Sequence, residues 1–392
     1  MNSSMRVSGR PKTILHIIDS LEYGGAQRLL SLLAQFTPPE SYRMVVAVLQ
    51  DKNPLAQKFE KTGVNLYLFN RARPSILKPL RFISYVYRNL KDIISICKKE
   101  HVDIIHCHLS DAEFLGILAA VILGIRNVFI TIHVSRLFPP YSKSDPRLLA
   151  RKLLMRILYR FTKGIISVSK EVTDEVQNIV KVSKEKIFTL INGIDTKVFE
   201  NPGDCEYIRE ELGLNQNTKV LLNVGRLTEA KGQVYLINAM KLLASRYPGI
   251  RLLIAGEGEL KPFLKELVIR NELERFVIFL GTRDDIPELL SLADVFVFPS
   301  VHEGTPLSLL EAMAAGKPIV ASDIPPHRDL LVDRHSAILV SPEDSLDLAE
   351  AIEKLLMDSK LGVELGMKAR ETVQKNFDIN VMISQLIEIW ER

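Results

Sequence analysis

The chain has 392 residues, of which 47% are hydrophobic, and this length predicts two or three globular domains with packed cores. Its three cysteines, Cys97, Cys107 and Cys205, lie far apart without CxxC spacing, which argues against a disulfide scaffold and a zinc site and favours a reducing cytosol. The net charge of +4 conceals an asymmetry, because residues 1–195 hold 29 basic and 16 acidic side chains, whereas residues 196–392 hold 22 and 31.

The first half alternates strand and helix patterns. The apolar run at residues 14–18 is too short for a secretory segment. The longest apolar run, residues 114–125, is too short to cross a bilayer and predicts a buried helix. Helical patterns, the first at residues 26–36, separate most of the strands expected at residues 13–18, 45–49, 65–69, 103–106, 128–132 and 164–168. This alternation predicts a parallel, doubly wound sheet.

A second alternating series follows Asp195 and predicts a second Rossmann-like sheet. Neither first strand is followed by GxGxxG, which argues against a nicotinamide dehydrogenase. The turn-forming pair Asn192-Gly193 between the two series is expected to act as a hinge. Strands are expected at residues 220–224, 251–255, 276–280, 295–298, 318–322 and 337–340, with helices at 234–246, 260–271 and 286–292, and two helical stretches at the end.

The segment from Phe298 to Pro318 predicts a strand, a loop and a helix. We expect Thr305 to cap the helix, Pro306 to occupy its first position, and Gly316 to take the left-handed position after its end. A helix that begins beyond the carboxyl end of a parallel strand presents free N–H groups and a positive dipole. The segment therefore predicts an anion site, for example for phosphate.

Two glutamates lie within this segment. Glu303 is placed in the loop before the helix, and Glu311 two turns inside it. Eight helical residues span roughly 12 Å, more than the ~5–9.5 Å between paired glycosidase carboxylates, so two separate hydroxyl acceptors are expected. The alternative for Glu311 is a solvated helix residue, as most helical glutamates are.

The spacing of Glu303 and Glu311 within EGTPLSLLEAMAAGKP resembles the signature of the retaining glycosyltransferases of family 4. This resemblance implies an α/β chain of the GT-B fold, in which two Rossmann-like doubly wound domains face each other across a cleft. It implies an acceptor-binding domain at residues 1–192, a nucleotide-sugar-binding domain at 193–376, and a terminal helix at 377–392 that returns to the first domain. It further implies that Glu303 contacts donor sugar hydroxyls and Glu311 the ribose, with Gly304, Thr305 and Pro306 beside the donor.

Two cations follow the first strand of the second series. Arg226 and Lys231 flank a strand-to-helix turn, where they can neutralise a departing diphosphate, although such a pair is more often surface charge. The family has an Arg and Lys pair at this place, which favours leaving-group stabilisation. In the first half, Gly24 and Gly25 would let backbone N–H groups approach phosphate across the presumed cleft, and a plain tight turn is the equal alternative.

Histidines mark the ends of two strands in the first half. His133 ends the fifth strand, and the family usually has a cleft histidine near this place, although Val134 stands here where an acidic residue is common. His106 and His108 alternate on one strand face, and without a third ligand nearby we expect packing or acceptor contact rather than a metal. In the second half, the resemblance implies that the backbone at Thr282 and Arg283 contacts the nucleotide base, and a structural turn is the alternative.

Two basic helical stripes lie in the positively charged half. One comprises Lys152, Arg156, Arg160 and Lys163, beside an apolar stripe of Leu149, Leu153 and Ile157, and the other comprises Lys78, Arg81 and Arg88 with Tyr85. Each is most simply a solvated face. Two stripes in one half nevertheless favour a peripheral contact with anionic lipid over nucleic acid, for which no motif is present.

From these residues and the resemblance we expect a retaining, metal-independent glycosyltransferase without a cofactor. It would transfer a sugar from a nucleoside diphosphate sugar, with UDP as the expected nucleotide, to a glycan or lipid-linked acceptor in cell-surface polysaccharide or glycolipid biosynthesis. Its expected place is the cytoplasm, on the inner membrane face. The alternatives are a non-catalytic nucleotide-sugar-binding protein and another GT-B enzyme such as an epimerase or phosphorylase.

Overall fold

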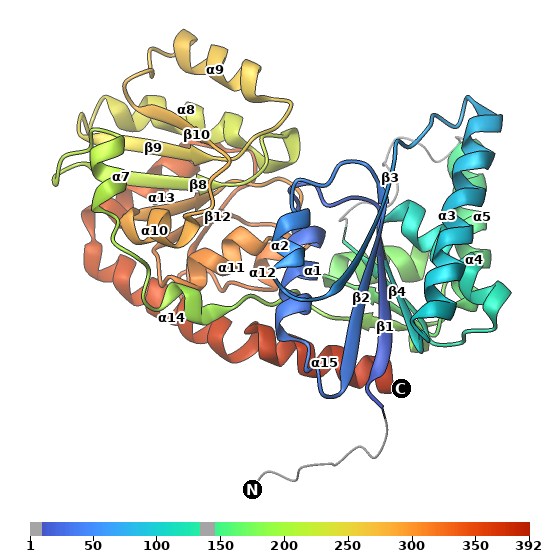
Figure 1. The fold of residues 1–392 in the computed structure, drawn as a ribbon. Coiled ribbons are helices and arrows are strands. Elements are labelled where there is room, and N and C mark those ends of the chain that lie inside the picture. Colours follow the sequence, from blue (N-terminus) through green and yellow to red (C-terminus); the bar gives the residue numbers. More distant parts are fainter. Residues whose placement is uncertain (1–9, 134–145) are drawn as a thin grey trace, which may run out of the picture. The chain divides into compact units, whose positions relative to one another are not determined.

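The computed structural model describes residues 10–133 and 146–392. The chain divides into two compact units, the first comprising Met1–Asn192 with Met382–Arg392 and the second Gly193–Val381. Each unit is built around one parallel sheet (Figure 1). The division near the middle of the chain falls between Asn192 and Gly193, at the turn-forming pair noted in the sequence.

The first unit contains a seven-stranded sheet in the order β3-β2-β1-β4-β5-β6-β7. The six predicted strands are present, and the sequence analysis missed β7, because three residues are too few to show a period of two. The strands are β1 Lys12–Ile18, β2 Tyr42–Gln50, β3 Asn65–Arg71, β4 Ile104–His108, β5 Val128–Ile132, β6 Gly164–Ser167 and β7 Ile187–Thr189.

Helices cover both faces of this sheet. They are α1 Gly25–Phe36, α2 Ala56–Glu60, α3 Pro79–Lys99, α4 Ser110–Leu123, α5 Pro146–Leu158 and α6 Lys170–Glu175, with short turns at Tyr159–Phe161, Val176–Val180 and Lys184–Lys186. The face that carries Cys107 packs against α3 and α4 in an apolar core. Within the described part of the chain, no helix combines the length and the apolarity needed to cross a bilayer.

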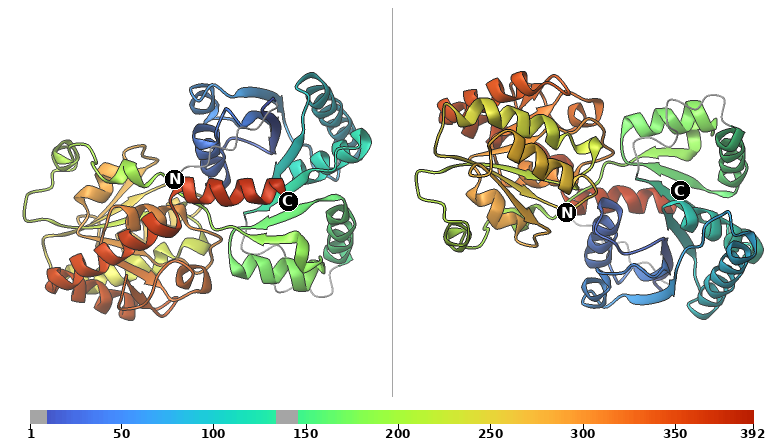
Figure 2. Two further views of the ribbon diagram at one scale, coloured as in Figure 1. Left: turned by 90° about the horizontal axis from the view of Figure 1, so that it is seen from below. Right: turned by 90° about the horizontal axis from the view of Figure 1, so that it is seen from above.

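The other face of the first sheet is covered by α1 and by the C-terminal helix α15, Ile379–Glu391 (Figure 2). Met382, Leu386 and Trp390, which are spaced four residues apart, are each 2% exposed. The indole of Trp390 meets the His16 ring edge to face, with 6.0 Å between ring centroids. Glu391 holds the end of the helix through Lys12 Nζ at 2.7 Å and the Tyr42 hydroxyl at 2.5 Å.

The second unit contains a six-stranded sheet in the order β10-β9-β8-β11-β12-β13. All six strands were predicted within about two residues of their observed ends. They are β8 Lys219–Val224, β9 Ile250–Ala255, β10 Val277–Gly281, β11 Val295–Phe298, β12 Ile319–Ser322 and β13 Ile338–Val340. All its pairings are parallel, so the carboxyl ends of these strands share one edge of the sheet.

The second unit has helices α7 Glu206–Glu211, α8 Gln233–Ala244, α9 Lys261–Arg270, α10 Ile286–Leu292, α11 Leu307–Ala314, α12 Pro325–Arg328, α13 Ser345–Met357 and α14 Ser359–Asn376, and 3₁₀ turns at Thr196–Phe199 and Glu229–Lys231. The expectation of two terminal helical stretches was wrong, because α13, α14 and α15 are three helices. Asp358 separates the first two and caps α14 by accepting from the Leu361 N–H at 3.0 Å. An aspartate cap is a weaker sequence signal than glycine or proline.

Helix α11 differs from its prediction at one end. Pro306 has an extended ψ of 104° and precedes the helix, so Leu307 is the first helical residue and Thr305 is not the N-cap. At the other end, Gly316 has φ +64° and takes the predicted left-handed position. The expected order of strand, loop and helix is therefore correct, with a start one residue later than predicted.

Candidate functional site

In the second unit, two loops that follow β8 and β11 meet at the carboxyl edge of the sheet. The Val301 N–H donates to the Ala230 carbonyl at 2.8 Å, which joins the two loop backbones. Lys231 Nζ lies 2.5 Å from Glu303 Oε1 in an ion pair that is mostly buried. Two residues that are 72 positions apart in the chain, both predicted to belong to the site, are thus brought together.

The close approach of these loops depends on Gly232. This residue has φ +65°, and a Cβ atom added to it would lie 2.1 Å from the Pro299 carbonyl oxygen. Any other side chain would therefore push the loops apart and separate Lys231 from Glu303.

A buried histidine completes this cluster, and the sequence analysis did not identify it. The His327 ring packs against Phe298 at 5.3 Å between centroids, and Lys231 Nζ lies 5.5 Å from the centroid of the same Phe298 ring. His327 Nδ1 lies 2.7 Å from the Ser322 carbonyl, and burial lowers the pKa of His327 while the charge of Glu303 opposes that shift. Its position just after β12, at the ligand-binding edge of the sheet, was the available signal.

Glu311 is buried inside α11. The residue is only 1% exposed, so the alternative of a solvated helix glutamate is wrong. The half-buried Gly304 and Thr305 precede the helix, and the positive end of its dipole lies beside Glu303 in the chain. The loop and the helix start thus offer backbone and dipole for an anion, while the two carboxylates provide hydroxyl acceptors.

The remaining predicted donor residues lie at the same edge. Arg226 follows β8 and is exposed. Thr282 and Arg283 follow β10, where the Arg283 guanidinium contacts Glu211 at 2.7 Å and Asp285 at 2.8 Å, an arrangement that raises the pKa of Arg283. Because this side chain already bridges two carboxylates, a ligand at this turn would meet backbone atoms, as the resemblance implies.

In the first unit, Gly24 and Gly25 start helix α1. Gly24 is the N-cap residue with φ −168°, an extended conformation open to any residue, so the backbone turn does not demand glycine. A Cβ atom added to Gly25 would meet nothing within 4 Å. A Cβ atom added to Gly24 would lie 2.6 Å from Oε1 of the buried Gln27, so glycine at this position leaves room for that side chain.

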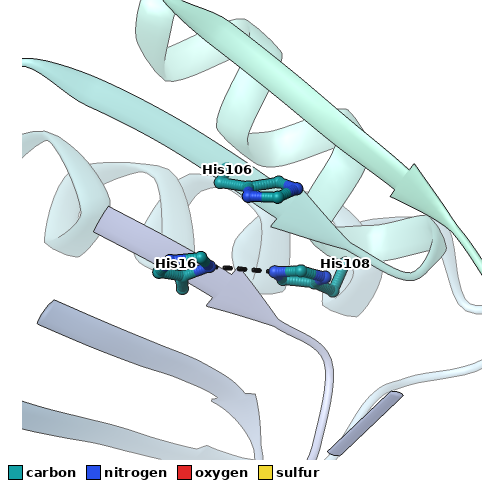
Figure 3. A group of neighbouring side chains, drawn as sticks. All are labelled: His16, His106 and His108. Atoms are coloured by element: carbon teal, nitrogen blue, oxygen red, sulfur yellow. Dashed lines mark hydrogen bonds between the residues drawn. The ribbon is translucent and has the colours of Figure 1, made fainter. Parts of the chain in front are cut away.

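Three histidines of the first unit lie together on one face of the sheet (Figure 3). His16 on β1 is the register partner of His106 on β4, and the candidate ligand atoms of His16, His106 and His108 all lie within 4.8 Å of one another. The expectation that no third histidine stands near His106 and His108 was therefore wrong. The doubly wound order, which places the first strand beside the fourth, was the signal that could have identified His16.

His133 follows β5 and contacts this group. Its Nε2 lies 3.1 Å from His108 Nδ1, and burial lowers the pKa of His133 to about 4. Val134, noted beside it in the sequence, lies outside the described residues. His133 thus stands at the carboxyl end of its strand, as predicted.

An acidic group at the same edge of the first sheet was also missed. Asp19 follows β1, and its Oδ1 accepts from the Ala112 N–H at 2.8 Å at the start of α4. Burial, and then the nearby charge of Asp111, raise the pKa of Asp19 to about 7. Arg73 pairs with Asp111 at 2.5 Å. In the sequence, Asp19 directly follows the apolar run at residues 14–18.

The basic stripes of the first unit differ from their prediction in two respects. Tyr85 points inward and is 5% exposed, so it does not lie among the basic residues of α3. The apolar stripe of α5, made of Leu149, Leu153 and Ile157, faces solvent with 46–70% exposure. At the start of α3, Leu77 precedes Lys78 and Leu80 precedes Arg81, and these two leucines are 89% and 83% exposed. The surface therefore combines basic and large apolar side chains.

Two family models match the chain. The model described as Glycosyltransferase Family 4 matches residues 23–198, and the model described as Glycosyl transferases group 1 matches residues 204–372. The first match ends six residues beyond the division between Asn192 and Gly193, and the second lies wholly within the second unit.

Individual proteins agree with these models. A UDP-Gal:alpha-D-GlcNAc-diphosphoundecaprenol alpha-1,3-galactosyltransferase of Escherichia coli is 28% identical over 93% of both chains. EpsD of Bacillus subtilis, assigned as a glycosyltransferase, is 30% identical over 73% of this chain and 75% of its own. A crystal structure of Anabaena HepE in complex with UDP-glucose superposes with a TM-score of 0.82 and 22% identity, covering 97% of this chain and 99% of that one.

Proposed function

Because the chain belongs to the family 4, or group 1, glycosyltransferases and has their fold, we propose that it transfers a sugar from a UDP-sugar to a hydroxyl of a glycan or lipid-linked acceptor, with retention of configuration. The Escherichia coli relative is named for a UDP-sugar donor and an acceptor on diphosphoundecaprenol, which supports this choice. The product would serve cell-surface polysaccharide or glycolipid biosynthesis, with the enzyme in the cytoplasm.

The observation that carries the proposal is the Lys231–Glu303 pair beside the start of α11. Breaking the glycosidic bond of a nucleotide sugar leaves negative charge on the diphosphate, which must be stabilised as it develops. Lys231, Arg226 and the N-terminus of α11 supply positive charge at one edge of the second sheet. They do so without a metal, for which the sequence has no motif.

The carboxylates orient the donor. Glu303, held by Lys231, accepts from hydroxyls of the sugar, whose ring gains oxocarbenium character as the bond breaks. Glu311 accepts from the ribose, and the backbone at Thr282 and Arg283 contacts the base. The second unit in this account holds the donor.

The first unit binds the acceptor in this account, and His133, Gly24 and Gly25 are the residues of that unit proposed to contact substrate. A donor phosphate oxygen takes the proton of the attacking hydroxyl, on the same face from which the diphosphate leaves.

Replacing Glu311 by glutamine tests its role in donor binding. Glutamine keeps the size of the side chain, so the packing of α11 is preserved while one charged acceptor is lost. A hydrogen bond to a charged group contributes about 1.5–3 kcal/mol, so the Kd for UDP should rise about tenfold or more. Calorimetric titration with UDP measures this, and an unaltered Kd in a normally folded variant removes Glu311 from the site.

We also propose a peripheral contact with anionic membrane through the exposed surface of α3 and α5. Lys78, which precedes α3, and Arg81 within it flank the exposed Leu80, and Arg156 on α5 lies beside the exposed Leu153. Apolar side chains enter the lipid interface while basic ones attract anionic headgroups. A lipid-linked acceptor would be reached at such a surface.

Neutralising Lys78 and Arg81 together with glutamine is expected to weaken binding to anionic vesicles. Each basic residue near the surface contributes about 1 kcal/mol, so the partition coefficient should fall about 10- to 30-fold. Vesicle flotation measures this, and Leu80→Glu should have a similar effect. Met367→Glu is the matched control, because Met367 is an exposed apolar residue of α14 in the second unit. Equal losses for Leu80→Glu and Met367→Glu would contradict a specific surface.

A donor panel with a membrane extract as acceptor tests the enzymatic proposal. Transfer from a UDP-sugar, retained in excess EDTA and giving a product with the anomeric configuration of the donor, is the expected result. Binding of the donor without transfer or hydrolysis would favour a non-catalytic binding protein. A rearranged free sugar or a sugar phosphate as the product would favour an epimerase or phosphorylase.

A further inference from the structure

Three histidine rings of the first unit are hydrogen-bonded end to end. His16 Nδ1 lies 3.0 Å from His108 Nε2, and His108 Nδ1 lies 3.1 Å from His133 Nε2. Figure 3 shows the bond between His16 and His108, with His106 beside them. His108 thus uses both of its ring nitrogens on other imidazoles. This row of hydrogen-bonded imidazoles, called the imidazole chain below, begins at His16 in the core of the sheet and ends at the half-buried His133.

All three rings are neutral near physiological pH. Burial lowers the pKa of His16 to about 3 and that of His133 to about 4, and it lowers the pKa of His108 as well. A neutral imidazole has one N–H and one acceptor nitrogen. Each of the two bonds joins an Nδ1 atom to an Nε2 atom and needs one donor. If His108 carries its proton on Nδ1, then His16 and His133 must also carry theirs on Nδ1. If His108 carries its proton on Nε2, all three rings are protonated on Nε2.

The inner end of the chain decides between these two arrangements. His16 Nε2 is buried and, within the described residues, has no hydrogen-bond partner. With the protons on Nε2 it would be an unpaired N–H, which is rarer in protein interiors than an unfilled acceptor. The protons therefore stand on Nδ1, and His16 Nε2 is left as an unfilled acceptor.

We propose that His16 and His108 are positioning residues that hold His133 as a neutral imidazole with its proton on Nδ1. His133 therefore presents an N–H donor at the carboxyl edge of the first sheet. The Nδ1–H of His133 can donate to an oxygen acceptor such as a sugar hydroxyl or a phosphate oxygen. In this tautomer the unprotonated Nε2 of His133 accepts from His108 Nδ1. The inference rests on the proposed function only for the identity of that oxygen, and it assigns His133 a donor role rather than that of a general base.

A metal ion is the competing interpretation of this cluster. The three imidazoles of His16, His106 and His108 lie close enough to suggest one. His16 and His108 already bond to each other, however, and His106 Nε2 lies 2.7 Å from Thr131 Oγ1. The observed bonds therefore favour the imidazole chain.

The tautomer of His133 can be measured directly. The full chain has eight histidines, so labelling them with nitrogen-15 gives spectra in which each ring can be assigned by single substitutions. At neutral pH, His133 of the wild type should be protonated on Nδ1 alone. Isolated histidine side chains prefer the proton on Nε2, so this result would require a constraint such as the one proposed.

Two variants break the chain at different points, and one matched control leaves it intact. His108→Leu removes the N–H that donates to His133 Nε2. The Nε2–H tautomer of His133 should then become the major form. His16→Leu keeps the bond to His133 but removes the group that sets its direction, so a mixture is expected. His106→Leu removes an equally buried histidine of the same strand that bonds to Thr131 instead, and the His133 tautomer should not change. If His108→Leu does not fold, the His133 tautomer measured in His16→Leu tests the proposal instead.

An activity measurement separates positioning from packing. His108→Leu should lower kcat for sugar transfer about tenfold, while the Kd for UDP stays within about twofold. Wild-type His133 protonated on Nε2 or on both nitrogens would overturn the proposal. So would an equal tautomer change in His106→Leu, or one equivalent of a metal that co-purifies and is removed by a chelator. A fixed Nδ1–H tautomer in a protein that transfers no sugar would uphold the positioning and reject the proposed function.

Discussion

Replacing Lys231 by alanine should lower kcat for sugar transfer by about 10²–10³, the effect of removing one preorganised donor from a developing anion. Lys231 Nζ is held 2.5 Å from Glu303 and beside Phe298, so its position is set before the donor arrives. Its charge therefore needs no reorganisation when the diphosphate leaves. Steady-state transfer kinetics measure the loss, and unchanged turnover would reject the role.

Stability must be measured alongside, because the substitution leaves the Glu303 carboxylate buried without its ion-pair partner. Breaking a buried pair by removing one partner costs about 3–5 kcal/mol of unfolding free energy. The double variant Lys231→Ala with Glu303→Gln removes the stranded charge and should recover stability but not kcat. Lys219→Ala is the matched control, since Lys219 starts β8 at the opposite edge of the sheet and pairs with Asp294. Its kcat should stay within about twofold of the wild type.

Glu303→Gln should separate sugar positioning from diphosphate binding. In the free protein, Glu303 neutralises the cation that the diphosphate needs. The variant releases Lys231, so the affinity for UDP should be kept or increased. Transfer should nevertheless fall about 10- to 100-fold in kcat/KM, because a charged acceptor of the sugar hydroxyls is lost.

The two measurements on Glu303→Gln have a clear opposing outcome. If the loss of the carboxylate weakens UDP binding and transfer by the same factor, Glu303 serves only to hold Lys231 in place. Glu266→Gln is a suitable control, because Glu266 pairs with Arg270 on the exposed surface of α9. It should alter neither quantity by more than about twofold.

Local sequence was sufficient for every strand except the three-residue β7 and for the end of the signature helix. The strand β11 is a short run of β-branched and aromatic residues, and Gly316 takes a backbone conformation that other residues rarely adopt. Both signals depend on neighbours within a few residues of the chain. The predicted N-cap of α11 failed by one residue because Pro306, with its fixed φ, suits both the cap and the first helical position.

Side-chain exposure was less predictable. Tyr85 was expected among the basic residues of its helix, yet it is buried, and the apolar stripe of α5 is exposed. For Glu311, a solvated position remained the alternative until the structure showed that it is buried. A helical period shows which residues share a face, but it does not show which face the rest of the fold covers. That depends on the packing of elements from distant parts of the chain.

The sequence by itself determined that this protein has two parallel α/β sheets and carries the glutamate signature of its family, because strand composition and motif spacing are local properties. Only the tertiary structure decided that Lys231 meets Glu303, that His327 joins them, and that His16 bonds to His108. Lys231 lies 72 positions from Glu303, His16 and His108 lie on β1 and β4, and His327 follows β12 while Phe298 ends β11. These contacts follow from strand order and from the close approach of backbones at Gly232. Such proximity is a property of the packed chain, because burial of the two cores determines which strand ends become neighbours.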